Sequence, residues 1–207
     1  PYAPIRTSHA PVAATRASFL TPDKPNAVVL ARHNLSLNLM DADFPALNIA
    51  NVILGGDPLK ARLAARIRQR DGLSYDVRSG LHQDDSREGR DDSGHIAIHA
   101  IAAPQNVAKV EQAIRDEFAA LVRDGVTEQE VRDAVAARLV VRQQVRGEDG
   151  VVASILGSHL YFGRDWSVEA DRDAVYGALT AEQVNAAIRK HFKPDQLSVF
   201  VAGDLGE

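Results

Sequence analysis

His95 and His99 are the nearest approach in this sequence to a metal-binding motif. Histidines four residues apart can share a zinc ion on a helix, where that spacing is one turn, and a glutamate between them would activate bound water. Here Ile96, Ala97 and Ile98 intervene, and the alternation indicates a strand. Strand residues four apart are separated by about 13 Å, at ~3.3 Å per residue, which is too far for one metal ion. We therefore expect both imidazoles on the wetter face of a strand, without a metal.

Other catalytic arrangements are missing from the sequence. The chain contains no cysteine, which excludes disulfides, thiolate catalysis and cysteine-based metal sites. No Ser-His-Asp arrangement is recognisable, and Gly55-Gly56 lacks the pattern and the lysine of a phosphate-binding loop. The acidic loop at residues 82–94 lacks the alternating ligand spacing of a calcium site. The sequence therefore names no group for hydrolysis by this chain alone.

Residues 51–81 have the best-defined local structure. Asp57 suits a helix N-cap and Pro58 the first helical position, while Gly72 suits the left-handed residue that ends the helix. Gly55 and Gly56, just before, supply the backbone freedom that a helix end or tight turn needs. The face of this helix predicted to enter the core carries Leu59, Leu63 and Ile67.

A strand is predicted at residues 73–78, with Leu73, Tyr75 and Val77 on one face. Arg68 then lies on the last helical turn and Tyr75 on the strand that follows. Spacing alone favours structural roles, in which Arg68 complements the negative end of its helix and Tyr75 is ordinary core. Arg62, on an amphipathic helix, would likewise hold a carboxylate or a loop.

The remaining pattern predicts an α+β fold. Residues 1–26 contain five prolines and are predicted to be an N-terminal arm or linker, which leaves residues 27–207 as the domain. Strands are predicted at 26–33, 95–102 and 197–202, with 95–102 as an antiparallel partner of 73–81. Helices are predicted at 43–54, where Asp43 can cap the start, and at 104–124, 128–144, 152–160 and 181–191. Leu156 and Leu160 continue the apolar pattern of the helix at 152–160, and two of the helices start at the capping boxes of Thr127 and Thr180. This order favours a two-layer sandwich, a mainly antiparallel sheet covered on one face by helices.

Charge and hydropathy narrow the function classes. The net charge is −4 and the pI about 6.0, so nothing favours binding to nucleic acid or to anionic membranes. No apolar run approaches the roughly 18 residues of a membrane span. The chain begins with Pro1 and shows no signal sequence, so we expect a piece of a longer or processed protein. The compartment stays open, with a bacterial periplasm and a cytoplasm both compatible.

The order of several segments resembles the second, non-zinc half of the M16 metallopeptidases, the family of insulinase, pitrilysin and mitochondrial processing peptidase. The resemblance covers nearly the whole chain. Ala61 and Ala64 depart from the serine and the aromatic residue usual in the family, which concerns packing more than chemistry. The matching segments are 43–47, 51–56, 62–63, 67–68, 72–73 with Tyr75, 124–130 and 179–184.

The resemblance implies that Arg68 and Tyr75 are accessory catalytic residues, which contact substrate backbone near a bond cleaved at a zinc ion held by the other half. Fixed donors of this kind stabilise the charge that develops on an attacked carbonyl. It also implies that Gly55, Gly56 and Arg62 bind substrate. The expected partners are the zinc-bearing half, on the same chain or another, and a peptide or unfolded polypeptide, which could add to a sheet edge. This chain should bind no cofactor and be inactive alone, because the family motif H-x-x-E-H is absent. Two alternatives remain, a structural or assembly subunit and a peptide-binding module that does not cleave.

Overall fold

A five-stranded mixed sheet organises the protein, whose computed structural model describes residues 5–86 and 90–205. The strand order is β1-β5-β2-β4-β3, so the apolar β2 lies in the middle. Only the β1–β5 pair is parallel, and the other pairs are antiparallel. The strands are β1 (Arg16–Leu20), β2 (Ala27–Ser36), β3 (Asp76–His82), β4 (Ser93–Ala102) and β5 (Ser198–Gly203).

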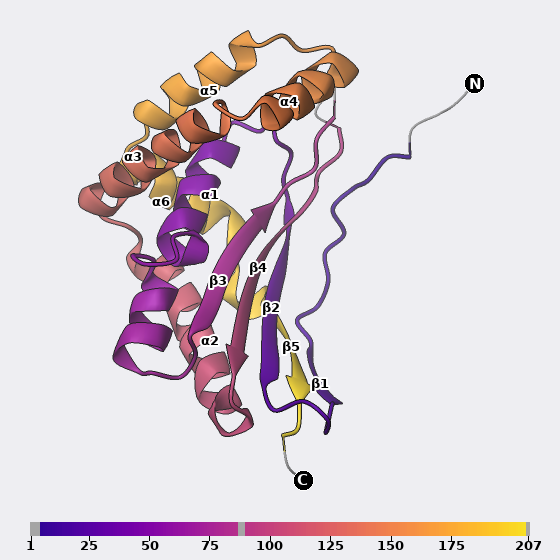
Figure 1. Ribbon diagram of the computed structural model, residues 1–207, viewed down its shortest axis with the longest axis vertical. Coiled ribbons are helices and arrows are strands. Elements are labelled where there is room, and N and C mark those ends of the chain that lie inside the picture. The colour runs from indigo at the N-terminus through magenta and orange to yellow at the C-terminus, as the bar shows by residue number, and fades with distance from the viewer. Residues whose placement is uncertain (1–4, 87–89, 206–207) are drawn as a thin grey trace.

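Helices pack on one face of this sheet, which confirms the predicted α+β class. Figure 1 shows α1, α2, α3 and α6 on one side of the strands, with α4 beyond the ends of β3 and β4. No helix among the described residues is both long and apolar enough to cross a membrane. The helices are α1 (Phe44–Asn51), the π-helical η1 (Val52–Gly56) and η2 (Ala64–Arg70), the 3₁₀ turns η3 (Pro104–Asn106) and η4 (Pro194–Gln196), and α2 (Val107–Asp124), α3 (Glu128–Val145), α4 (Asp149–Phe162), α5 (Ser167–Gly177) and α6 (Ala181–His191).

One hydrophobic core lies between the sheet and these helices. Along β4, each side chain that faces the helices is buried, and Ile96 and Ile98 are completely inaccessible. The alternate residues His95 and His99 are half-buried on the opposite, open face, as predicted. Both predicted capping boxes are present, because the side chains of Thr127 and Thr180 accept from the backbone N–H three residues on.

Several local predictions around residue 57 are wrong. Residues 57–60 form a turn, in which Asp57 Oδ1 accepts from the backbone N–H groups of Leu59 and Lys60. Leu59 is 63% exposed, although Leu63 and Ile67 are completely buried as predicted. β3 begins at Asp76, and Tyr75 precedes it with an exposed side chain because the chain has not yet joined the sheet.

Two helix predictions also need correction. Asp43 makes no capping bond to α1, because its carboxylate accepts from Lys190 Nζ at 2.6 Å and from His191 Nε2 at 2.9 Å. The bond from Lys190, and after it the bond from His191, hold the pKa of Asp43 below its usual value. The apolar pattern at 152–160 does form a helix, α4, but Leu156 and Leu160 are exposed rather than core.

The N-terminal segment predicted as an arm contributes an edge strand. β1 pairs in parallel with β5, and its side chains are mostly exposed. Before it, Thr7 and His9 donate their backbone N–H groups to Asp91 and Asp92 of the β3–β4 connection. The arm is therefore hydrogen-bonded to the domain at two places.

Candidate functional site

Arg68 and Tyr75 are both exposed at the junction between η2 and β3. The phenol of Tyr75 belongs to a side chain that is 73% exposed. Arg68 is also exposed, and its Nη1 donates to the Pro58 carbonyl oxygen at 3.3 Å. A guanidinium and a phenol are both hydrogen-bond donors, so this junction can bind an acceptor such as a peptide carbonyl.

The backbone between these two residues is fixed by a short turn. Gly72 has φ +60°, the left-handed conformation that the sequence predicts. The backbone N–H of Leu73 donates to the Ile67 carbonyl at 2.9 Å, which closes the end of η2. The buried Ser74 Oγ lies 2.6 Å from the Ile101 carbonyl oxygen of β4. Tyr75 therefore extends from a backbone that is anchored on both sides.

Arg66 anchors η2 itself to α2. Its Nη2 donates to Asp116 at 2.8 Å and its Nη1 to Glu117 at 3.2 Å. The hydrogen bond from Arg66 lowers the pKa of the Asp116 carboxyl, with a smaller contribution from Gln112. The face of η2 that carries Arg66 is therefore engaged, while Arg68 faces solvent.

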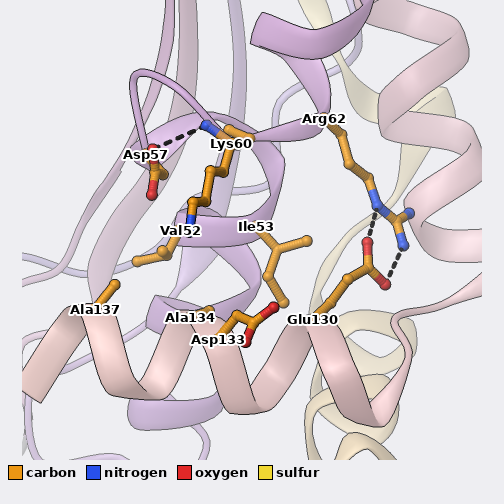
Figure 2. Close-up of a pocket in the computed structure, with 10 residues that line it drawn as sticks. Val52, Ile53, Asp57, Lys60, Arg62, Glu130, Asp133, Ala134 and Ala137 are labelled. Carbon is orange, nitrogen blue, oxygen red and sulfur yellow. Dashed lines mark hydrogen bonds and ion pairs between the residues drawn. The ribbon is translucent and has the colours of Figure 1, made fainter.

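Arg62 is held by a bidentate ion pair with Glu130 of α3. Its Nε and Nη2 donate to the two carboxylate oxygens at 2.7 and 2.9 Å, and Nη2 also donates to the Gly125 carbonyl at 2.8 Å. Burial alone would raise the pKa of Glu130, but bonds from Arg62 and Thr127 outweigh it and lower the pKa. The pair borders a cavity of about 130 Å³ (Figure 2). Substrate binding by Arg62 stays a prediction.

Gly55 is packed closely against β3, and Gly56 follows it at the surface. The glycines with positive φ among the described residues are Gly72, Gly125 and Gly163, so neither of this pair uses that freedom. A Cβ on Gly55 would lie 2.7 Å from the backbone N of Ser79 in β3. Gly55 therefore lets η1 approach the strand, whereas Gly56 is exposed. Substrate contact by either glycine remains a prediction.

The histidines of the open face pair across strands rather than along one. His95 lies opposite His82 of β3, with ring centroids 4.9 Å apart. Burial, then the charges of Arg32 and His82, lower the pKa of His95 to about 4. Across residues 5–86 and 90–205, no three side chains of His, Cys, Asp or Glu gather as a metal-ligand set. These parts of the chain therefore offer no site that fits zinc.

Comparison with known proteins identifies the fold and the family. The family described as "Peptidase M16 inactive domain" matches residues 6–138. The chain belongs to the M16 peptidase family. An uncharacterized zinc protease of Mycobacterium leprae is 31% identical over 142 residues, which cover 68% of this chain and 30% of that protein.

Solved structures share this fold. The M16 inactive domain structure from Pseudomonas fluorescens has a TM-score of 0.83 at 24% identity, covering 98% of this chain and 46% of that one. A chain of complex III from Candida albicans has a TM-score of 0.75 at 14% identity, covering 94% of this chain and 47% of that one. This M16 domain thus spans only about a third to a half of the length of these relatives.

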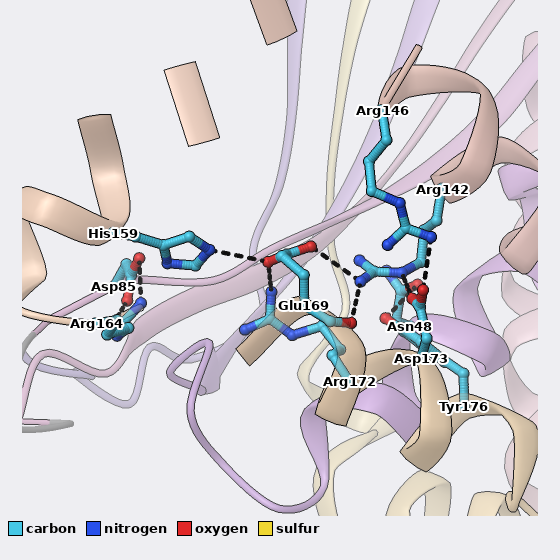
Figure 3. Close-up of polar contacts among 10 residues, drawn as sticks. All are labelled: Asn48, Asp85, Arg142, Arg146, His159, Arg164, Glu169, Arg172, Asp173 and Tyr176. Atoms are coloured by element: carbon cyan, nitrogen blue, oxygen red, sulfur yellow. Dashed lines mark hydrogen bonds and ion pairs between the residues drawn. The ribbon is translucent and has the colours of Figure 1, made fainter. Parts of the chain in front are cut away.

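A buried charged cluster in this M16 domain was not predicted from the sequence. Arg142 of α3 donates to Glu169 Oε2 at 2.9 Å and also bonds Asp173, both on α5 (Figure 3). His159 of α4 is buried, with its Nε2 3.2 Å from Glu169. A signal was present, because arginines recur at four-residue spacing along α3 and at its C-cap, and acids do so on α5: Arg138, Arg142 and Arg146, with Glu169 and Asp173.

Proposed function

We propose that this M16 domain is the non-zinc half of a zinc peptidase and that Arg68 and Tyr75 hold the substrate backbone near the cleaved bond. The observation that carries the proposal is the exposure of both donors on an anchored junction, with Tyr75 73% exposed. Arg66 on the same segment pairs with two carboxylates of α2, whereas the bond that Arg68 makes is to the Pro58 carbonyl oxygen. Exposed donors on a fixed backbone suit recognition of an external acceptor.

The chemistry assigned to this chain is binding and charge stabilisation. The likeness to zinc proteases supports a metal on the other half, where it would activate water. A peptide carbonyl develops negative charge on oxygen when it is attacked, and the donors of Arg68 and Tyr75 would stabilise that charge. Loss of one such donor costs roughly 2.7–4 kcal/mol, which is about 100- to 1,000-fold in kcat.

Gly55 and Arg62 support this site by position, on our proposal. Gly55 permits the close contact of η1 with β3, and β3 follows Tyr75 directly. Arg62 ties the segment before η2 to α3 through Glu130. Gly56 is exposed beside them and remains the candidate for direct contact with the substrate.

The test is reconstitution with the half that carries H-x-x-E-H. The isolated chain should not cleave peptides, and mixing should restore cleavage. Arg68→Ala and Tyr75→Phe should then lower kcat by about 100-fold or more. Arg70→Ala is the matched control, because Arg70 is exposed on the same segment but pairs with Asp71. Cleavage by the isolated chain would refute the division of labour, and full activity of Arg68→Ala would refute the site.

The likeness to a complex III chain supports a second candidate, a structural subunit without proteolysis. Such a subunit would form a stable complex with its partner, and Arg68→Ala would leave both the complex and its activity unchanged. Reconstituted cleavage that depends on Arg68 excludes this candidate.

A further inference from the structure

Helix α4 presents an apolar face to solvent. The α4 stripe consists of Ala153, Leu156, Gly157 and Leu160, which share one helix face and are all exposed. Leu156 is 48% exposed and Leu160 82%, while the one fully buried side chain of α4 is His159. A surface helix normally turns such a stripe toward a core. The stripe therefore lacks a cover within the described part of the chain.

Polar contacts hold α4 in this orientation. His159, which lies off the stripe, has its Nε2 3.2 Å from Glu169. Just after the helix, Arg164 donates to Asp85 at 3.0 Å and to the Ser86 carbonyl at 2.8 Å (Figure 3). α4 is thus fastened to α5 and to the β3–β4 connection, with Val152, Ile155 and Phe162 partly buried and the α4 stripe left exposed.

Apolar side chains on the open face of the sheet are also incompletely buried. There Leu30 of β2 and Ile101 of β4 are only half-buried, although they lie in central strands. Ala97 pairs with Arg32 on one side and Gly80 on the other, and a Cβ on Gly80 would meet nothing within 4 Å. Small residues at this position leave room for a helix to approach. The open sheet face is defined by Val28, Leu30, Gly80, Ala97 and Ile101.

We propose that a second copy of this chain covers both surfaces, with the α4 stripe of each copy packed on the open sheet face of the other. Each copy carries both surfaces, so one two-fold axis would bring the α4 stripe of each copy onto the open sheet face of the other. The charges also match, because exposed Glu148 and Asp149 start α4, whereas exposed Arg32 and Arg78 project from the open face. This assembly goes beyond the proposed peptidase function and uses neither Arg68 nor Tyr75.

The first test is the mass of the chain in solution. Analytical ultracentrifugation should show a concentration-dependent dimer, and Leu156→Asp with Leu160→Asp should make it a monomer. Each leucine buried at the contact should contribute roughly 10- to 100-fold to the dimer affinity. Val175→Asp is the matched control, since Val175 of α5 is 46% exposed but lies off the stripe. Its dimer should be unchanged, and circular dichroism should show that both variants are folded.

The second test locates the contact by disulfide cross-linking. The chain has no cysteine, so each introduced cysteine is the only one in its chain. Oxidation of a mixture of Leu156→Cys and Ala97→Cys chains should give a disulfide-linked dimer of the two. A mixture of Val175→Cys and Ala97→Cys chains should not. A monomer at all concentrations, or a dimer that survives the two aspartates, overturns the proposal. Cross-links that join only two Leu156→Cys chains overturn it as well, because they place helix against helix.

Discussion

Gly55→Ala should destabilise the domain, although alanine is the better helix former. The added Cβ would lie 2.7 Å from Ser79 N and 2.8 Å from Leu63 Cδ1. Ser79 N is backbone in a paired strand, and Leu63 is completely buried, so neither can move freely. Overpacking of this kind costs about 1–3 kcal/mol, and the gain from removing a glycine is about 0.4–1 kcal/mol. The net loss should be about 1–2 kcal/mol.

The matched control is Gly177→Ala, a helical glycine whose added Cβ would meet nothing within 4 Å. It should stabilise by about 0.4–1 kcal/mol, so one chemical change should give opposite signs at two positions. Urea unfolding followed by circular dichroism measures both, and the melting temperature of Gly55→Ala should fall by about 2–8 °C. A Gly55→Ala protein as stable as the parent would refute the reasoning, because it would show that η1 and β3 can separate without cost.

Two further perturbations test the charged contacts. Glu169→Ala should cost about 3 kcal/mol in urea unfolding, because it leaves the buried Arg142 short of one partner, whereas Asp171→Ala on the exposed side of α5 should change little. Asp43→Asn should lower stability at pH 6, and the loss should shrink toward about pH 2 as the folded carboxyl becomes protonated. The sign follows from the pKa, which Lys190 lowers from 3.8, so the contribution is present above that value and is lost as pH falls through the folded pKa. Equal destabilisation by Asp43→Asn at both pH values would contradict this account.

The sheet and the helices that cover it were predictable because side-chain periodicity and helix-capping residues are local features of the sequence. β4 alternates strictly along its length, and both capping boxes begin helices where the sequence places them. Gly72 is at positive φ as predicted. The boundary between η2 and β3 was not predictable in the same way, since the alternation at 73–78 starts before the chain joins β4 at Asp76. Alternation specifies faces but not where hydrogen bonding begins.

Only part of the candidate site could be predicted from the sequence. The family resemblance selected Arg68 and Tyr75, and their exposure is compatible with that role, but spacing alone favoured a buried Tyr75. The partner of Arg62 is 68 positions away, so no local pattern could specify Glu130. Gly55 was read as a source of backbone freedom, yet its requirement arises from a strand that lies 24 positions later. Contacts at such separations depend on topology rather than on periodicity.

Helix α4 shows that hydrophobic periodicity indicates which face of a helix is apolar but not which surface covers that face. Its pattern predicts that a face should be covered, and free energy of about 1.5–3 kcal/mol per buried leucine favours that cover wherever it comes from. Within the described chain α4 turns another face inward, which carries the buried His159, bonded to Glu169, and the partly buried Val152, Ile155 and Phe162. A buried histidine among apolar neighbours is therefore the informative residue, since rolling the leucines inward would break its hydrogen bond and expose it. The prediction that Leu156 and Leu160 pack in a core can still hold for an assembly of two chains, and their replacement by aspartate separates that outcome from a stripe that stays exposed.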